Sequence, residues 1–510
     1  MMEAATSHPG VRGSFTRDFT ASIVVFLVAM PLCMGIAIAS GVPPEKGLVT
    51  GIIGGVVVGL LAGSPLQVSG PAAGLAVIVF EFVQEHGLAA LGPVLLLAGL
   101  FQLVAGMLKL GGYFRSISPA VVHGMLAGIG ALIVIGQFHI LFDDKPMSSG
   151  LENIAAMPGQ LLGLSPFNLR HTEYALLIGL FTIGVMVGWE KLRPQSLKLV
   201  PGALLGVVGA TVIAWSIDLP IGRVDVPASI MGAIDVPNEA GWLAPLAHPA
   251  LLMTALALAF IASAETLLSA AAVDRMHDGV RTDYNKELRA QGVGNLLCGL
   301  AGALPMTGVI VRSSANVQAG AQTRWSTIMH GAWILGFVAL LPALLREIPM
   351  AALGGVLVVT GWRLVSLRHV RHLFENYGLL PAAIWAVTFI LVVTTNLLTG
   401  VLVGLGLSVA EILQHRKNLR LKVEEEEHEN MRRLRLEGAA TFVSLTRLTN
   451  VLERIPDGRA VHLDLDRLYG LDHTSTEMMR DWVARRRGGG QTVELSGPGH
   501  VVARLAPAAY

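Results

Sequence analysis

Long apolar runs recur along the chain from Phe19 to about Leu413. A helix that crosses a membrane needs roughly 17 to 25 mostly apolar residues. The pattern therefore predicts a polytopic all-α membrane protein with about fourteen transmembrane segments, at residues 19–40, 47–63, 66–83, 89–108, 118–138, 174–189, 198–216, 248–272, 287–302, 306–321, 325–345, 349–362, 379–395 and 397–413.

Lysine and arginine gather in alternate loops between these runs, as they do on the cytoplasmic side of a membrane. With the N-terminus inside, the inner loops hold Lys109, Arg115, Lys191, Arg193, Lys198, Arg275, Arg281, Lys286, Arg289, Arg324, Arg363, Arg368 and Arg371. The outer loops hold only Lys46, Lys145, Arg170, Arg223 and Arg346. This asymmetry predicts an even number of spans in a bacterial-type inner membrane, with both termini in the cytoplasm. Residues 1–17 lack the features of a cleaved signal, so we interpret them as a cytoplasmic segment before a retained first helix.

The composition changes abruptly after Gln414, where charged residues replace the apolar runs. The pattern then predicts a strand at 434–445, a helix at 446–455, a strand at 460–465, a helix at 475–486 and a strand at 492–496. We therefore divide the chain into a transmembrane domain, 18–414, and a small cytoplasmic α/β domain, 415–510.

The composition limits the classes of protein to which this chain can belong. Of 510 residues, 53% are hydrophobic and 14% are charged, which is typical of a protein in a lipid bilayer. The formal net charge of +1 does not favour a nucleic-acid partner. The two cysteines, Cys33 and Cys298, both stand in apolar stretches, so we predict neither a disulfide nor a metal site. No catalytic motif and no cofactor site is recognisable, so we do not expect an enzyme.

Two of the segments begin with backbone that is broken by glycine and proline. The third opens with Pro65-Leu-Gln-Val-Ser-Gly-Pro-Ala-Ala-Gly74 and the tenth with Leu304-Pro-Met-Thr-Gly-Val-Ile-Val-Arg312. Such backbone is tolerated at membrane depth only where protein buries it or where it lines a cavity. Each stands third in its half of the chain, which predicts an inverted repeat of seven plus seven segments with the substrate site at the paired breaks.

A half-helix that starts at the membrane midplane offers unpaired N–H groups and a partial positive charge to an anion. In the third segment Pro71 suits the first helical turn, which leaves the amides of Ala72 and Ala73 to be offered. In the tenth, the corresponding amides are those of Val309, Ile310 and Val311. A kink between packed helices would explain either break alone, whereas the matched pair favours an anion site.

Two ionisable residues lie inside apolar runs, Glu265 in the eighth segment and Arg312 in the tenth. A charge at such depth costs about 2.5 to 3.5 kcal/mol on insertion scales and marks a functional candidate. Arg312 would place positive potential behind the anion, and Glu265 would couple transport to a proton or another cation. The alternative is a buried structural ion pair between the two.

The sequence resembles the sulfate permease (SulP) family of anion transporters. The resemblance rests on Asn285-Lys-Glu-Leu-Arg-Ala-Gln-Gly-Val-Gly-Asn295, on the tenth segment through Gly320, on Met30 to Pro44, and on 461–465 with 471–475. It implies core and gate domains, a homodimer, elevator-like movement and a C-terminal STAS domain. The substrate-binding residues it implies are Leu32, Ala72, Ala73, Ser269, Val309, Ile310, Val311 and Arg312, with Glu265 for ion coupling.

The substrate stays open. Many members have Ile-Pro-Gln in the first segment and Ser-x-Ser-Arg in the tenth, where this chain has Met30-Pro31-Leu32 and Val309-Ile-Val-Arg312. Backbone amides then replace side-chain donors, which leaves bicarbonate or sulfate, with H⁺ or Na⁺ as the coupling ion. The alternatives are a proton-coupled C4-dicarboxylate carrier, a nucleobase carrier, and a STAS-based scaffold or sensor with residual transport. Thr474 and Ser475 fall where some STAS domains carry a phosphorylated serine.

Overall fold

The structure is a computed structural model. It describes residues 11–114, 118–147, 149–164, 170–226, 230–236, 248–277, 279–365, 370–371, 374–375, 379–413, 421–427, 431–456 and 459–505. These residues fall into two compact units, one of residues 1–111 and 126–366 and the other of residues 112–125 and 367–510.

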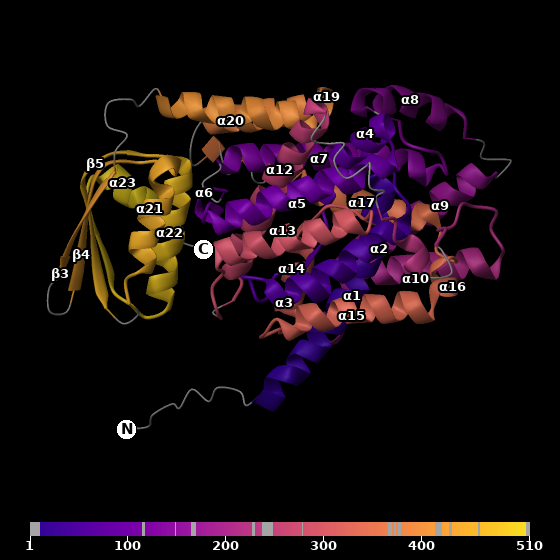
Figure 1. Cartoon of the computed structure of the whole chain (residues 1–510), viewed down its shortest axis with the longest axis horizontal. Coiled ribbons are helices and arrows are strands. Elements are labelled where there is room, and N and C mark those ends of the chain that lie inside the picture. Colours follow the sequence, from indigo (N-terminus) through magenta and orange to yellow (C-terminus); the bar gives the residue numbers. More distant parts are fainter. Residues whose placement is uncertain are drawn as a thin grey trace. The chain divides into compact units, whose positions relative to one another are not determined.

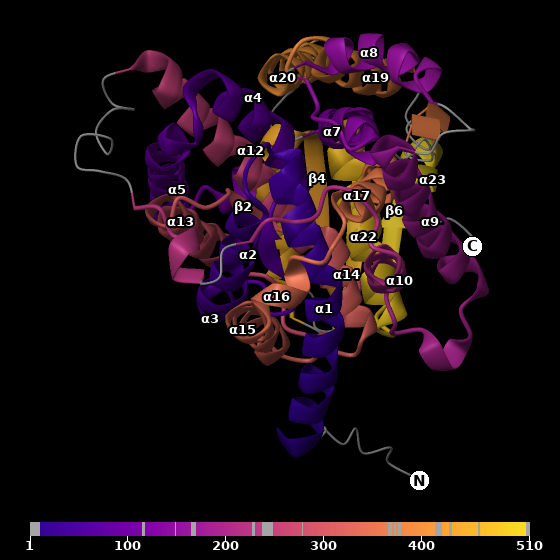
Figure 2. The same cartoon turned by 90° about the vertical axis from the view of Figure 1, so that its right-hand side faces the viewer.

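Each of the fourteen predicted membrane segments contains a helix (Figures 1 and 2). Among the described residues, six helical spans are long and apolar enough to cross a bilayer, and five further apolar helices are shorter. The helices of these segments are α1 (Val11–Ala39), α2 (Pro44–Ile52), α3 (Gly59–Leu61), α4 (Ala76–His86), α5 (Leu91–Met107), α7 (Pro119–Leu141), α9 (His171–Leu192), α10 (Gly202–Ser216), α12 (Pro249–Asp274), α13 (Tyr284–Leu300), α14 (Ile310–Gln318), α15 (Trp325–Leu340), α17 (Met350–Leu364), α19 (Leu379–Thr394) and α20 (Leu397–Leu413).

Shorter elements lie between these helices. They are α6 (Gly111–Phe114), α8 (Gly150–Leu162), α16 (Pro342–Leu345), the π-helical turn η1 (Ile53–Val58) between α2 and α3, and the 3₁₀ turns η2 (Ala73–Leu75), η3 (Leu88–Ala90), η4 (Gln195–Leu197) and η5 (Ile230–Ala233). The expected fold class, a polytopic helical membrane protein with an added small α/β part, is confirmed.

The first unit contains two groups of packed helices. The core group joins α1 to α2, α14 and α15, and packs α5 beside α13 and α12 (Figures 1 and 2). The gate group packs α9, α10 and α17 against one another. Helix α1 contacts both groups, so its buried face lies where core and gate meet.

The C-terminal part of the second unit is a four-stranded sheet of β3 (Lys422–Glu427), β4 (Met431–Ala440), β5 (Ala460–Leu471) and β6 (Val493–Ser496), in that order. β3 pairs antiparallel to β4, whereas β4, β5 and β6 are parallel. Figure 1 shows α21 (Phe442–Glu453) and α22 (His473–Gly488) packed on one face of this sheet, and α23 (Gly499–Leu505) follows β6. Apolar side chains of strands and helices form one core between them. This arrangement fits a STAS domain.

One prediction about this part was wrong, and one strand was missed. Residues 442–445 belong to helix α21 and not to a strand, because Thr441 and Ser444 form a capping box that starts the helix. Residues 422–427, for which no element was predicted, form edge strand β3. Arginines of β4 face its glutamates, as in the pair of Arg432 with Glu425, and opposite charges across a strand pair stabilise it.

Asp464 on β5 forms ion pairs with Arg433 and Arg435 of the neighbouring strand β4. Burial alone would raise its pKa, but the Asp466 amide and the Arg433 and Arg435 guanidiniums hold the pKa of the Asp464 carboxyl below its usual value. Because the folded state has the lower pKa, the ionised carboxylate stabilises this part above the unfolded pKa. That contribution is lost as pH falls through the folded pKa.

We expect Asp464→Asn to lower the stability of the C-terminal sheet by about 1.5 to 3 kcal/mol, the range for hydrogen bonds to charged groups. Amide hydrogen exchange of β4 and β5 in the full-length protein at neutral pH measures the effect. The exposed Asp466, changed to Asn, is the matched control. Equal exchange in both variants would contradict a stabilising role for the Asp464 carboxylate.

Candidate functional site

The two broken segments cross each other as a short antiparallel ribbon inside the first unit. β1 (Ser69–Pro71) pairs with β2 (Met306–Gly308), with Gly70 opposite Thr307. All six residues are buried. Each segment thus satisfies backbone groups of the other, which is how non-helical backbone avoids unpaired polar groups away from water.

A half-helix leaves each end of the ribbon, and its start differs slightly from the sequence prediction. Pro71 is the last residue of β1, and Ala72 is still extended. The helical turn begins at Ala73, so the offered amides start one residue later than predicted, and the Gly74 amide already faces the Glu265 carboxylate.

The second half-helix, α14, begins at Ile310. The amide of Val309 donates to the carbonyl of Val68 at 2.9 Å, so the prediction that this amide is offered to an anion was wrong. The first intrahelical bond runs from the Ser313 amide to the Val309 carbonyl. The amides of Ile310, Val311 and Arg312 therefore have no acceptor within the helix.

Arg312 is wholly buried on the side of α14 that faces the ribbon. A Cβ added at Gly70 would lie 2.1 Å from Arg312 Nη1, so the guanidinium passes directly against the β1 backbone. Among the described residues, none of its three side-chain nitrogens has a hydrogen-bond partner. A buried polar group of this kind in a native fold needs a functional explanation.

Glu265 of α12 approaches the other half-helix. A Cβ added at Gly74 would lie 2.4 Å from Glu265 Oε2, and this oxygen is buried with no hydrogen-bond partner among the described groups. Ser269 follows one helical turn later and is also buried. Because all three Arg312 side-chain nitrogens are unpartnered, the structure does not contain the alternative Glu265–Arg312 ion pair. The two charges lie at different half-helices.

Helix α13 holds the ribbon with three polar residues spaced one turn apart, Glu287, Gln291 and Asn295, each almost fully buried. Asn295 accepts from the Met306 amide at 2.8 Å and donates to the Met306 carbonyl at 3.1 Å. Gln291 donates to Ser69 Oγ at 2.6 Å. Glu287 accepts from the amides of Gly63 and Ser64, just before the ribbon.

Sequence reasoning used this stretch only as a family resemblance and assigned its polar residues no role. The available signal was their spacing, because residues four apart share one face of a helix. Three polar side chains on one face of a buried helix predict a polar partner, but the sequence does not say that the partner is the β1–β2 ribbon.

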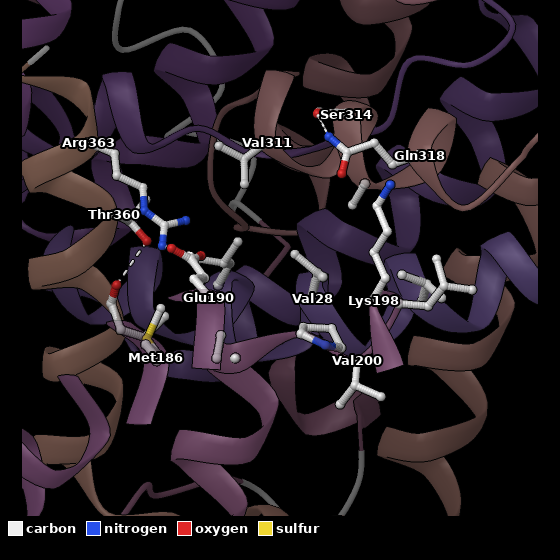
Figure 3. Close-up of a pocket in the computed structure, with 18 of the residues that line it drawn as sticks. Val28, Met186, Glu190, Lys198, Val200, Val311, Ser314, Gln318, Thr360 and Arg363 are labelled. Carbon is white, nitrogen blue, oxygen red and sulfur yellow. Dashed lines mark hydrogen bonds and ion pairs between the residues drawn. The ribbon is translucent and has the colours of Figure 1, made fainter. Parts of the chain in front are cut away.

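A cavity of about 490 Å³ lies between the core group and the gate group (Figure 3). Leu32 of α1 and Ile310 and Val311 of α14 line it, facing Met186 and Val200 from the gate side. Figure 3 shows Val311, Ser314 and Gln318 on one side of the cavity and Met186 and Glu190 across from them. Of the predicted site residues, Ala72, Ala73, Ser269, Val309, Arg312 and Glu265 do not line the cavity.

Basic side chains stand around part of this cavity. Arg193, Lys198 and Arg363 contribute to its wall, and Arg363 is ion-paired with Glu190. Three cations against one carboxylate give this part a positive balance, which favours the entry of anions.

The chain matches the family model described as "Sulfate permease family" over residues 15–388. YvdB of Bacillus subtilis, whose name gives a provisional assignment as a sulfate transporter, is 32% identical over 77% of this chain and 73% of its own. The bicarbonate transporter BicA of Picosynechococcus is 27% identical over 79% of this chain and 70% of its own.

Solved structures show the same fold. The transmembrane domain of a cyanobacterial BicA superimposes with a TM-score of 0.62 at 23% identity, covering 78% of this chain and 97% of that one. The overall structure of SLC26A9 superimposes with a TM-score of 0.68 at 16% identity, covering 97% of this chain and 86% of that one.

The fold and its crossing half-helices define a multi-pass membrane transporter. This chain belongs to the sulfate permease family, whose members carry inorganic anions across membranes, and it is a transporter and not an enzyme.

We expect Gly70→Ala to lower the transport rate by about tenfold or more, because the new methyl group must displace the Arg312 guanidinium from a closed environment. Anion uptake into proteoliposomes measures the effect. Gly184→Ala on α9 is the control, because a Cβ there meets nothing within 4 Å. Unchanged transport in Gly70→Ala would show that the Arg312 position is not needed.

Proposed function

We propose that this protein is a secondary active transporter of a small inorganic oxyanion of the bicarbonate or sulfate type. The anion binds between the half-helix that starts at Ala73 and the half-helix α14. The observation that carries the proposal is the buried crossing of β1 and β2, which aims two helix N-termini into one region and places the unpartnered Arg312 behind it.

The chemistry of this region supports an anion without a metal or cofactor. Helix N-termini carry partial positive charge and free N–H groups, and a buried guanidinium adds a full positive charge. The side chains of Ala72, Ala73, Val309, Ile310 and Val311 hold no hydrogen-bonding group. The backbone amides and Arg312 would therefore provide the attraction, while Leu32 and Ser269 complete the walls.

Elevator-like movement of the core group past the gate group is supported by the cavity between them. Arg193, Lys198 and Arg363 belong to loops that the charge asymmetry places in the cytoplasm, so this conformation is open to the cytoplasm. In the other state the core group would carry the anion to the opposite side.

Glu265 is the coupling group in this proposal. Its Oε2 is buried without a partner beside Gly74, at the half-helix opposite α14. Binding of H⁺ or Na⁺ at this carboxylate would neutralise it and reduce its repulsion of the substrate anion, so the cation and the anion would move together.

The proposal also covers the N-terminal segment, the STAS domain and the oligomeric state. Residues 1–17 and the STAS domain, 415–510, lie in the cytoplasm, and the protein acts as a homodimer in the inner membrane with the STAS domain as a regulatory part. Ser475 is fully buried at the start of α22, so its phosphorylation would require this helix to open.

We expect proteoliposomes to take up one labelled anion among bicarbonate, sulfate and succinate, driven by either a proton or a sodium gradient. In Glu265→Gln the gradient response should disappear, because the neutral amide can neither take up and release a proton nor offer a negative charge to a sodium ion. Glu81→Gln on α4 is the matched control, since no part of the mechanism uses this carboxylate. Uptake of succinate alone would favour the dicarboxylate carrier, and uptake of none by a folded protein would favour the scaffold or sensor.

We expect a cysteine at Val311 to react with a water-soluble, membrane-impermeant thiol reagent added from the cytoplasmic side, and the transported anion to slow this reaction. Val311 is 37% exposed and lines the cavity. The native Cys33 and Cys298 are buried. Leu335→Cys on α15 is the control: Leu335 is 42% exposed but outside the cavity lining, and we expect no reaction there because it faces lipid. If the anion does not slow the reaction at position 311, the anion binds elsewhere.

A further inference from the structure

Helix α8 has its apolar face on the outside, which is the reverse of a surface helix in a water-soluble protein. Leu151, Ile154, Leu161 and Leu162 are 51%, 42%, 52% and 87% exposed. At 100° per residue these four positions, together with Ala155 and Pro158, fall on one side of the helix. The opposite side contains Asn153 and Gln160, which are buried or half-buried.

The polar side of α8 is bonded to the end of α7. The Asn153 carbonyl lies 3.2 Å from His139 Nε2, and the Gln160 amide donates to Asp144 at 2.8 Å. The Asn153 side chain also donates to the carbonyls of Met147 and Ser149 and accepts from the Met147 amide. These contacts fix which face of α8 points outward. Figure 1 shows α8 as a separate short helix beside α7.

The neighbours of α8 along the chain identify what covers its apolar face. It connects two membrane-spanning helices, α7 and α9, and α9 itself exposes Leu177, Leu180 and Phe181. Both α8 and the membrane-spanning α9 thus expose apolar side chains, which favours lipid as the cover of the outward face of α8. The helix contains Glu152 and no lysine or arginine, so attraction to anionic headgroups does not contribute.

We propose that α8 is an interfacial helix that lies in the outer leaflet, with its apolar face in the boundary between headgroups and acyl chains. Helices of this kind bury their apolar face about 5 to 10 Å below the headgroups. Through Asn153 and Gln160, α8 anchors the end of α7 at a constant depth while the core group moves.

The test is electron paramagnetic resonance of spin labels at Ile154→Cys and Leu161→Cys in the full-length protein in phosphatidylcholine vesicles. We expect both labels to be accessible to oxygen and shielded from a water-soluble nickel complex. A label at Lys145→Cys, in the exposed loop before α8, should show the opposite. Protein without an introduced cysteine gives the background, because Cys33 and Cys298 are buried.

Each other outcome would overturn the proposal. Access of the nickel complex at all three positions would mean that α8 faces water. Shielding from both reagents, with short distances between labels of two copies, would mean that a second copy covers the face. A label depth that changes when phosphatidylglycerol is added would mean that anionic headgroups, and not the acyl boundary, hold the helix. Retained anion uptake by the labelled variants shows that they are folded.

Discussion

The mutual pairing of two interrupted membrane segments is the constraint on which the rest of this structure depends. Backbone that leaves a helix inside a bilayer exposes N–H and C=O groups that water cannot reach, and each unpaired group costs several kcal/mol. β1 and β2 solve this problem for each other. Once they are paired, the helices that follow them must begin at this buried position. Two helix N-termini therefore lie at a depth where an uninterrupted membrane helix has none.

The surrounding polar residues are best understood as supports for this ribbon. Asn295 holds the Met306 backbone through both its amide and its carbonyl, and Gln291 holds Ser69. Ser313 accepts from the Val68 amide, while Thr266 accepts from the Gly308 amide. These bonds come from three different helices, α12, α13 and α14. A ribbon held from three sides would keep its geometry during the elevator-like movement of the core group that we propose.

Arg312 and Glu265 have opposite charges, but the ribbon and its half-helices keep them apart. Among the residues that the structure describes, neither has a partner that would neutralise it, and burial of such charges is unfavourable unless something compensates. In our proposal the anion compensates Arg312 and the coupling cation compensates Glu265. Coupling then has an electrostatic origin, because occupation of each position lowers the energetic penalty of occupying the other.

The sequence alone determined the fold class, the number of membrane segments, the two broken segments and the family. These features depend on local composition, on hydrophobic length and on motifs that any stretch of chain displays by itself. It also placed helix and strand order in the C-terminal part, apart from the strand at 422–427 and the start of α21. Charged edge strands resemble loops in sequence because their stability comes from the strand opposite.

Only the tertiary structure decided how these pieces combine. It showed that Pro71 ends a strand, that the Val309 amide is bonded to Val68, and that Glu265 and Arg312 are not paired. It also gave Glu287, Gln291 and Asn295 their role and turned the apolar side of α8 outward. Each of these facts depends on contacts between residues far apart in the chain, and residue spacing within one segment contains no information about its partner.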